Sequence, residues 1–130
     1  MKYTRNELSY TIAIITGLIV MLGILLLCKG CYADEWRISH YCACEKCCGK
    51  WADGHFASGK KVYVGGVACN WLKFGTKIEI DGKIYTVEDR GAKSIFGDNN
   101  NHIKAIDIYC DSHQEARNKG IYYSKVKIIE

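Results

Sequence analysis

Two aspartates in apolar, strand-like runs are the residues of this chain whose types and surroundings best suit chemistry. Asp89 lies in residues 85–91 (YTVEDRG), and Asp107 lies between isoleucines in residues 105–109 (AIDIY). Burial raises the pKa of a carboxyl group, and two carboxylates that share a site push their pKa values apart, so that one can donate a proton near neutral pH. The pair therefore predicts an acid/base site of the kind that cleaves glycosidic bonds.

The same residues also fit an ordinary surface. Side chains alternate along a strand, which puts Ile106 and Ile108 on one face and Asp107 on the other. Charged residues are mostly exposed, so Asp107 could face water. Asp89 could equally be a turn residue before Arg90 and Gly91. The residues alone leave the catalytic and the surface interpretation open.

The elements that must position these aspartates are short strands. Strands are expected over residues 36–41, 77–80, 83–87, 105–109 and 123–129, with two short extended pieces over 61–69 broken at Gly65-Gly66 and polar loops over 49–60 and 94–104. The Asp81-Gly82 pair predicts a hairpin with a type I′ turn. Ser112 and Glu115 form a capping box that begins one short helix, and Gly120 ends it. The pattern predicts a mainly β protein, a small closed six-stranded barrel with one short helix.

The N-terminal segment predicts a membrane anchor. Residues 8–28 carry no charge, and the apolar run 12–27 is long enough for the hydrocarbon core of a bilayer. We therefore expect a transmembrane helix through residues 9–28, an anchor and stalk over 1–33, and an extracytoplasmic domain over 34–130. A cleaved signal peptide, giving a secreted protein, is the alternative, although the apolar run exceeds the usual length for one.

Charge and cysteine content narrow the remaining possibilities. The net charge is +4, and the sequence has no basic stripe with interleaved aromatics, so no nucleic acid is expected as a partner. Six of the eight cysteines lie in the predicted domain, residues 34–130, enough for up to three disulfides whose pairing stays open. A zinc knuckle built on Cys44-x-x-Cys47 is an alternative, but no second such pair follows. The predicted disulfide candidates are Cys42, Cys44, Cys47, Cys48, Cys69 and Cys110.

Seven short tracts, in order, carry a resemblance over most of residues 39–129. They are YCACEKCCGK (41–50), ASG (57–59), VACN (67–70), FGTK (74–77), EDRG (88–91), IDIY (106–109) and SHQEA (112–116). The chain resembles the three-aspartate (3D) domain of bacterial and phage wall-active proteins, which also forms the C-terminal part of membrane-bound lytic murein transglycosylase A. The resemblance implies a double-psi β barrel.

The resemblance further implies cleavage of the β-1,4 bond between N-acetylmuramic acid and N-acetylglucosamine in peptidoglycan. The substrate's own C6 hydroxyl attacks, which leaves a 1,6-anhydro end, and no metal or other cofactor is expected. Asp107 takes the role of the acid/base, with Asp89 as its catalytic partner. Asn70 stands where the family has its first aspartate. The predicted substrate-binding residues are Asn70, Gly91 and Tyr109.

Two alternatives to an enzyme remain. Aromatic residues such as Trp51, Trp71 and Tyr109 could stack on sugars, which would make the barrel a non-catalytic module that binds cell-wall glycan. The cysteine cluster could instead belong to a zinc-stabilised interaction domain. The predicted partners are the peptidoglycan glycan strand and, through residues 9–28, the membrane.

Overall fold

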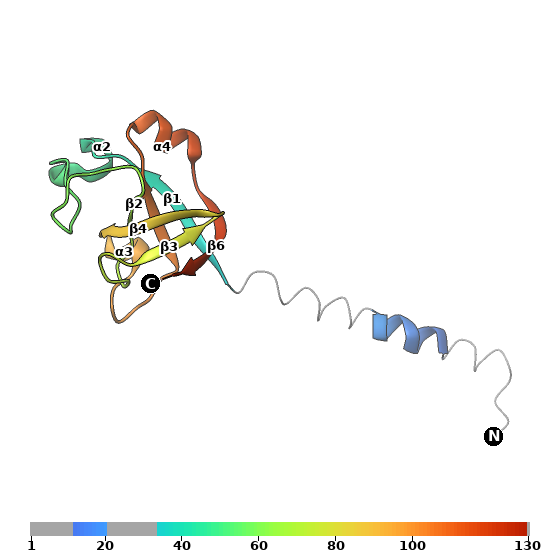
Figure 1. The fold of residues 1–130 in the computed structure, drawn as a ribbon. Helices are drawn as coiled ribbons and strands as arrows, with labels where there is room; N and C mark the ends of the chain where they lie inside the picture. The colour runs from blue at the N-terminus through green and yellow to red at the C-terminus, as the bar shows by residue number, and fades with distance from the viewer. Residues whose placement is uncertain (1–11, 21–33, 130) are drawn as a thin grey trace, which may run out of the picture. The chain divides into compact units, whose positions relative to one another are not determined.

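The computed structural model describes residues 12–20 and 34–129, and the chain divides into two units, Met1–Asp34 and Glu35–Glu130 (Figure 1). In the first unit, residues 12–20 form a helix whose side chains are exposed. The hydroxyl of Thr16 donates to the carbonyl oxygen of Ile12, 2.9 Å away, within this helix.

The structure corrects the predicted membrane anchor. Among the described residues, no helix is long and apolar enough to cross a membrane. This finding contradicts the localisation predicted from the sequence. Residues 9–11 and 21–28 of the expected span lie outside the described residues.

Six strands of the second unit close into a barrel in the order β1-β5-β2-β4-β3-β6. The β1/β5 and β2/β4 pairs are parallel, and the other four pairs are antiparallel. This architecture confirms the predicted mainly β, six-stranded barrel. The strands are β1 (Glu35–Tyr41), β2 (Gly66–Ala68), β3 (Lys77–Ile80), β4 (Lys83–Asp89), β5 (Ala105–Tyr109) and β6 (Tyr122–Ile128).

The β3–β4 hairpin forms as its turn residues predict. Ile80 pairs with Lys83, and the two residues between them have positive φ angles, 50° at Asp81 and 74° at Gly82. Positive φ at both central positions is the requirement of a type I′ turn, which aspartate tolerates and glycine favours. The local sequence therefore fixes this register.

Strand β5 is covered on both faces. Ile106 and Ile108 belong to the barrel core, as the alternation predicts. On the opposite face Tyr109 is also buried, in a second cluster with Tyr41 and Phe56. Asp107 therefore lies on a face that other elements cover, and it is only partly exposed. The open-surface interpretation of this strand is wrong.

Four short helical segments lie between the strands. Helix α4 (His113–Lys119) is the predicted one: the hydroxyl of Ser112 accepts from the Glu115 N–H at 3.2 Å, and Gly120 has a φ of 60°. The single-helix prediction misses three helical turns, of which the last interrupts an expected polar loop. These turns are α2 (Glu45–Cys48), η1 (Gly49–Trp51) and α3 (Lys93–Phe96).

Candidate functional site

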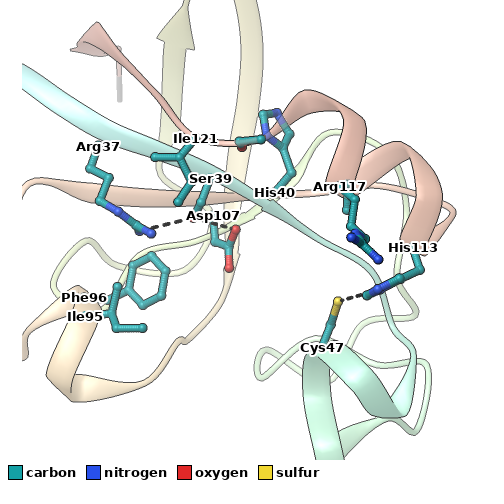
Figure 2. Close-up of a pocket in the computed structure, with 12 residues that line it drawn as sticks. Arg37, Ser39, His40, Cys47, Ile95, Phe96, Asp107, His113, Arg117 and Ile121 are labelled. Carbon is teal, nitrogen blue, oxygen red and sulfur yellow. Dashed lines mark hydrogen bonds between the residues drawn. The ribbon is translucent and has the colours of Figure 1, made fainter.

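A cavity of about 320 Å³ lies against the outer face of β1 and β5 (Figure 2). Asp107 from β5 and Arg37 and Ser39 from β1 line it, with Phe96 of α3 and Arg117 of α4. Asp107 is the one carboxyl group among the lining residues, which also include two arginines, Arg37 and Arg117. A single acid in a partly enclosed cavity is a candidate for proton transfer.

Register explains the immediate contacts of Asp107. It lies opposite Ser39 in the parallel β1/β5 ladder, and the Ser39 hydroxyl donates to Asp107 Oδ1 at 2.9 Å. Arg37 Nη1 donates in turn to the Ser39 oxygen at 3.4 Å. Among the described residues, none donates to Oδ2, which leaves this oxygen available to a bound molecule.

Burial raises the pKa of Asp107 to about 6. The Ser39 hydrogen bond and the charge of Arg37 oppose this rise, and the charge of Asp89 adds slightly to it. Desolvation prevails because a charged carboxylate loses more hydration than one hydroxyl and one more distant cation restore. Asp107 can therefore be protonated in a substantial fraction of molecules in weak acid.

Asp89 has a different environment. It pairs with Ala68 of β2, whose other neighbour is Asp107, so the two aspartates lie on either side of one residue. Asp89 Oδ1 accepts from the Ala57 N–H at 2.9 Å and from the Arg90 N–H at 2.8 Å, and the Tyr41 hydroxyl donates to Oδ2 at 2.5 Å. Asp89 does not line the cavity, and its oxygens are engaged in binding the loop after β1 and the turn after β4.

Asn70 and Gly91, both predicted to bind substrate, bond to each other. Asn70 Oδ1 accepts from the Gly91 N–H at 2.8 Å, and Asn70 Nδ2 donates to the carbonyl oxygens of Gly91 at 3.0 Å and Gly97 at 2.7 Å. A Cβ on Gly91 would lie 2.3 Å from the Phe96 ring, so glycine permits this close approach. These contacts hold the turn that carries Phe96 to the cavity.

The predicted aromatic contacts separate into different environments. Tyr109 is 6% exposed and packs edge-on against Tyr41 and Phe56. Trp71 stacks between Trp36 and His102, with ring centroids 5.2 and 4.7 Å away. Trp51 is 71% exposed, which leaves its ring open to a ligand.

Sequence reasoning missed the groups that surround Asp107. Arg37 and Ser39 occupy alternate positions on β1, and Arg117 lies on α4. The one available signal is the i, i+2 spacing of Arg37 and Ser39, which places both on one strand face. The parallel partner of β1 cannot be identified from that spacing.

The six cysteines of the described domain are free thiols, so the structure shows none of the predicted disulfides. The Sγ atoms of Cys42 and Cys44 are 3.1 Å apart, beyond the bonding distance of about 2.05 Å. The thiols of Cys42, Cys44 and Cys47 instead surround Nδ1 of His113, and the four ligand atoms all lie within 4.8 Å of one another. Sequence reasoning missed His113 because it lies 66 positions after Cys47, inside the capping segment of α4.

The fold and the cavity define a small β-barrel protein with one half-buried acid and two arginines at a concave site. No family model matches the chain, and no curated protein is similar to it in sequence.

Proposed function

We propose that this protein cleaves the glycan strand of peptidoglycan as a lytic transglycosylase, with Asp107 as acid and then base. The observation that carries the proposal is the isolation of Asp107: it is the one carboxyl group lining the cavity, its pKa is raised to about 6, and its Oδ2 accepts no hydrogen bond from the described residues. The ordered tracts shared with three-aspartate domains supply the substrate class.

The proposed chemistry needs only this acid. Protonated Asp107 gives its proton to the glycosidic oxygen as the bond to the anomeric carbon breaks. The C6 hydroxyl of the same muramic acid attacks that carbon, and the Asp107 carboxylate takes the hydroxyl proton. Because the nucleophile belongs to the substrate, the second carboxylate of an ordinary glycosidase is unnecessary. The engagement of Asp89 by three donors supports this one-acid route.

The charges of the cavity suit an acidic glycan. Arg37 and Arg117 both line it, and cations at a concave surface attract anions. The free carboxylates of the peptide stems of peptidoglycan are groups of this kind. We therefore assign the two arginines to substrate orientation, while Asp89 has a positioning role through Tyr41 and the backbone N–H of Ala57.

We also propose that the barrel is of the double-psi type. Two features support it: the closed six-stranded order, and the two parallel pairs β1/β5 and β2/β4 joined by antiparallel neighbours. In this arrangement β2 lies between the strands that carry Asp89 and Asp107. This interleaving sets one aspartate on each side of Ala68.

Digestion of purified peptidoglycan by the full chain tests the proposed activity. Mass spectrometry is expected to find 1,6-anhydromuropeptides, and Asp107→Asn is expected to lower their release by a factor of roughly 10²–10⁴, the usual contribution of a general acid. Asp111→Asn, at an exposed aspartate on the same segment, is the matched control and retains activity. Products with reducing ends would indicate a hydrolase, and equal release by Asp107→Asn would reject the assignment.

A non-catalytic glycan-binding module is the second candidate, and the exposed ring of Trp51 favours it. Lys50 Nζ lies 5.0 Å from the centroid of this ring, and both residues belong to the exposed η1 turn. Co-sedimentation with insoluble cell wall that is lost in Trp51→Ala, is kept in Asp107→Asn and is not accompanied by cleavage would support this candidate over the enzyme.

A further inference from the structure

We propose that Cys42, Cys44, Cys47 and His113 form a binding site for a single zinc ion. Three thiol sulfurs and one imidazole nitrogen converge, and all four atoms lie within 4.8 Å of one another. Sulfur and nitrogen in this number are the donors of structural Cys₃His zinc sites. The proposal concerns a different set of side chains from the proposed catalytic function and does not depend on it.

The distances between the ligand atoms are close to those around one tetrahedral ion, except that the sulfurs of Cys42 and Cys44 lie nearer to each other. Zinc bonds of about 2.3 Å to sulfur and 2.0 Å to nitrogen require about 3.8 Å between sulfurs and about 3.5 Å between sulfur and nitrogen. The observed distances from Cys42 Sγ are 3.1 Å to Cys44 and 3.7 Å to Cys47. His113 Nδ1 lies 3.9, 3.5 and 3.4 Å from the sulfurs of Cys42, Cys44 and Cys47.

The donor types favour zinc over other ions. Thiolate ligands select soft or borderline metals and disfavour magnesium and calcium, which prefer oxygen. The short distances between the four ligand atoms suit one ion at the centre, whereas a two-iron cluster would separate its ligand pairs further. Four protein ligands also complete a tetrahedron, which characterises a structural rather than a catalytic zinc.

The site would join two distant parts of the chain at the cavity. Cys42, Cys44 and Cys47 follow β1 and enter α2, whereas His113 is the first residue of α4. Cys47 and His113 both line the cavity that holds Asp107, as Figure 2 shows. A zinc ion would therefore fix one wall of the proposed active site.

A neighbouring cysteine provides a matched control. Cys48 directly follows Cys47, but its thiol donates to the carbonyl oxygen of Cys42 at 3.3 Å and does not belong to the cluster. His55 provides the corresponding control for His113, because it is an exposed histidine outside the cluster. Cys48 and His55 are therefore expected to be non-ligands, although they are chemically like the ligands Cys47 and His113.

Metal analysis of the full chain, purified without chelators, is the first test. We expect about one equivalent of zinc per chain, and at least tenfold weaker binding in Cys47→Ser and His113→Ala when zinc is titrated against a chromophoric chelator. Cys48→Ser and His55→Ala are expected to bind like the wild type. Circular dichroism of each variant distinguishes loss of a ligand from loss of the fold.

Cobalt substitution and alkylation give readouts that do not depend on enzymatic activity. Cobalt bound to the wild type is expected to show thiolate charge-transfer and tetrahedral ligand-field absorption, which Cys47→Ser weakens and Cys48→Ser retains. Zinc is expected to protect the exposed Cys47 from alkylation until a chelator is added. Failure of the folded wild type to bind zinc or cobalt, equal alkylation with and without metal, or thiols that react only after reduction would overturn the site.

The two proposals can fail separately. Failure of the folded wild type to bind zinc, with anhydromuropeptide release intact, would overturn the zinc site and leave the catalytic assignment in place. One equivalent of zinc in a chain that releases no anhydromuropeptide would overturn the catalytic assignment and leave the zinc site in place.

Discussion

At Asp107, burial and hydrogen bonding act on the pKa in opposite directions. Burial raises it to about 6, while the donated hydrogen bond from Ser39 and the charge of Arg37 lower it. A general acid must be protonated in the free enzyme, so kcat/KM should be highest below pH 6 and fall about tenfold per pH unit above it. The pH at which kcat/KM begins to fall depends directly on Ser39.

Replacing Ser39 by alanine is expected to shift the fall in kcat/KM to higher pH. The substitution removes a donor that favours the charged carboxylate, so the pKa of Asp107 rises, by about 1 unit for a hydrogen bond worth about 1.4 kcal/mol. The pH dependence of kcat/KM for anhydromuropeptide release measures the shift. Ser94→Ala, at an exposed serine, is the control. An unchanged pH dependence of kcat/KM in Ser39→Ala would mean that another group controls it.

The buried charge of Asp107 is also expected to cost stability. Its folded pKa of about 6 lies above the ordinary value of 3.8, so the folded state binds more protons between these two pH values. Stability therefore falls as pH rises through this window and stays low above it. Asp107→Asn should raise the free energy of unfolding by about 3 kcal/mol at pH 7.5 and by little at pH 4.

Urea unfolding at both pH values checks this prediction. A gain in stability of the same size at pH 4 and pH 7.5 would show that the charge is not its cause. Asp111→Asn, at an exposed aspartate, is expected to show little change at either pH. A more stable but inactive Asp107→Asn protein is the trade-off expected at a catalytic residue.

At the scale of the elements, the turn after β4 depends on the amide of Asn70. Both its donor and its acceptor are used, toward Gly91 and Gly97. Asn70→Asp would set a carboxylate, which cannot donate when ionised, against two carbonyl oxygens. We expect a loss of about 3 kcal/mol in unfolding free energy at pH 7, because two bonds are lost and a charge is left beside acceptors.

Thermal unfolding measures this loss. Asn118→Asp on α4 is the matched control, because Asn118 is exposed and its Oδ1 accepts from Gln114, which an aspartate can also do. If Asn70→Asp loses no more unfolding free energy than Asn118→Asp, the Asn70 amide does not stabilise the turn.

Locally encoded elements could be predicted from the sequence, whereas their partners could not. The Asp81-Gly82 turn, the β5 alternation and the Ser112 cap each depend on residues a few positions apart. The parallel neighbours of β1 and β2 depend on the tertiary fold, so Arg37 and Ser39 could not be assigned to Asp107. Helix α3 was missed because a four-residue turn gives no periodicity.

The same distinction holds within the candidate site. The tracts around Asp89 and Asp107 indicated two catalytic carboxylates, but only their surroundings separate an acid in a cavity from an aspartate engaged by three donors. The Cys44-x-x-Cys47 spacing indicated two thiols near each other and did not identify the two further groups. His113 reaches them only through the packing of α4 on β1.

At the scale of the whole molecule, the proposed zinc site predicts a stability that depends on metal. An ion that binds only the folded state stabilises it by mass action, and about 1 kcal/mol shifts the Tm of a domain this size by about 4–8 °C. Adding a chelator to the zinc-loaded chain should therefore lower its Tm by at least about 5 °C.

Differential scanning calorimetry with and without chelator checks this effect. Cys47→Ser should unfold at the lower temperature and show no further shift with chelator, while Cys48→Ser should behave like the wild type. A chelator shift of equal size in Cys47→Ser would place the metal elsewhere in the protein.

The parallel pairing of β1 with β5 has a consequence for how quickly the protein can reach its native state. Arg37 pairs with Ala105 and Tyr41 with Tyr109, so the barrel closes only when segments from opposite ends of the domain meet. Such contacts require closure of a long loop before they contribute any energy, and domains dominated by them fold in roughly milliseconds to seconds. The β3–β4 hairpin can form in roughly microseconds, before β1 pairs with β5. The cavity that holds Asp107 is therefore expected to be among the last parts of the molecule to assemble.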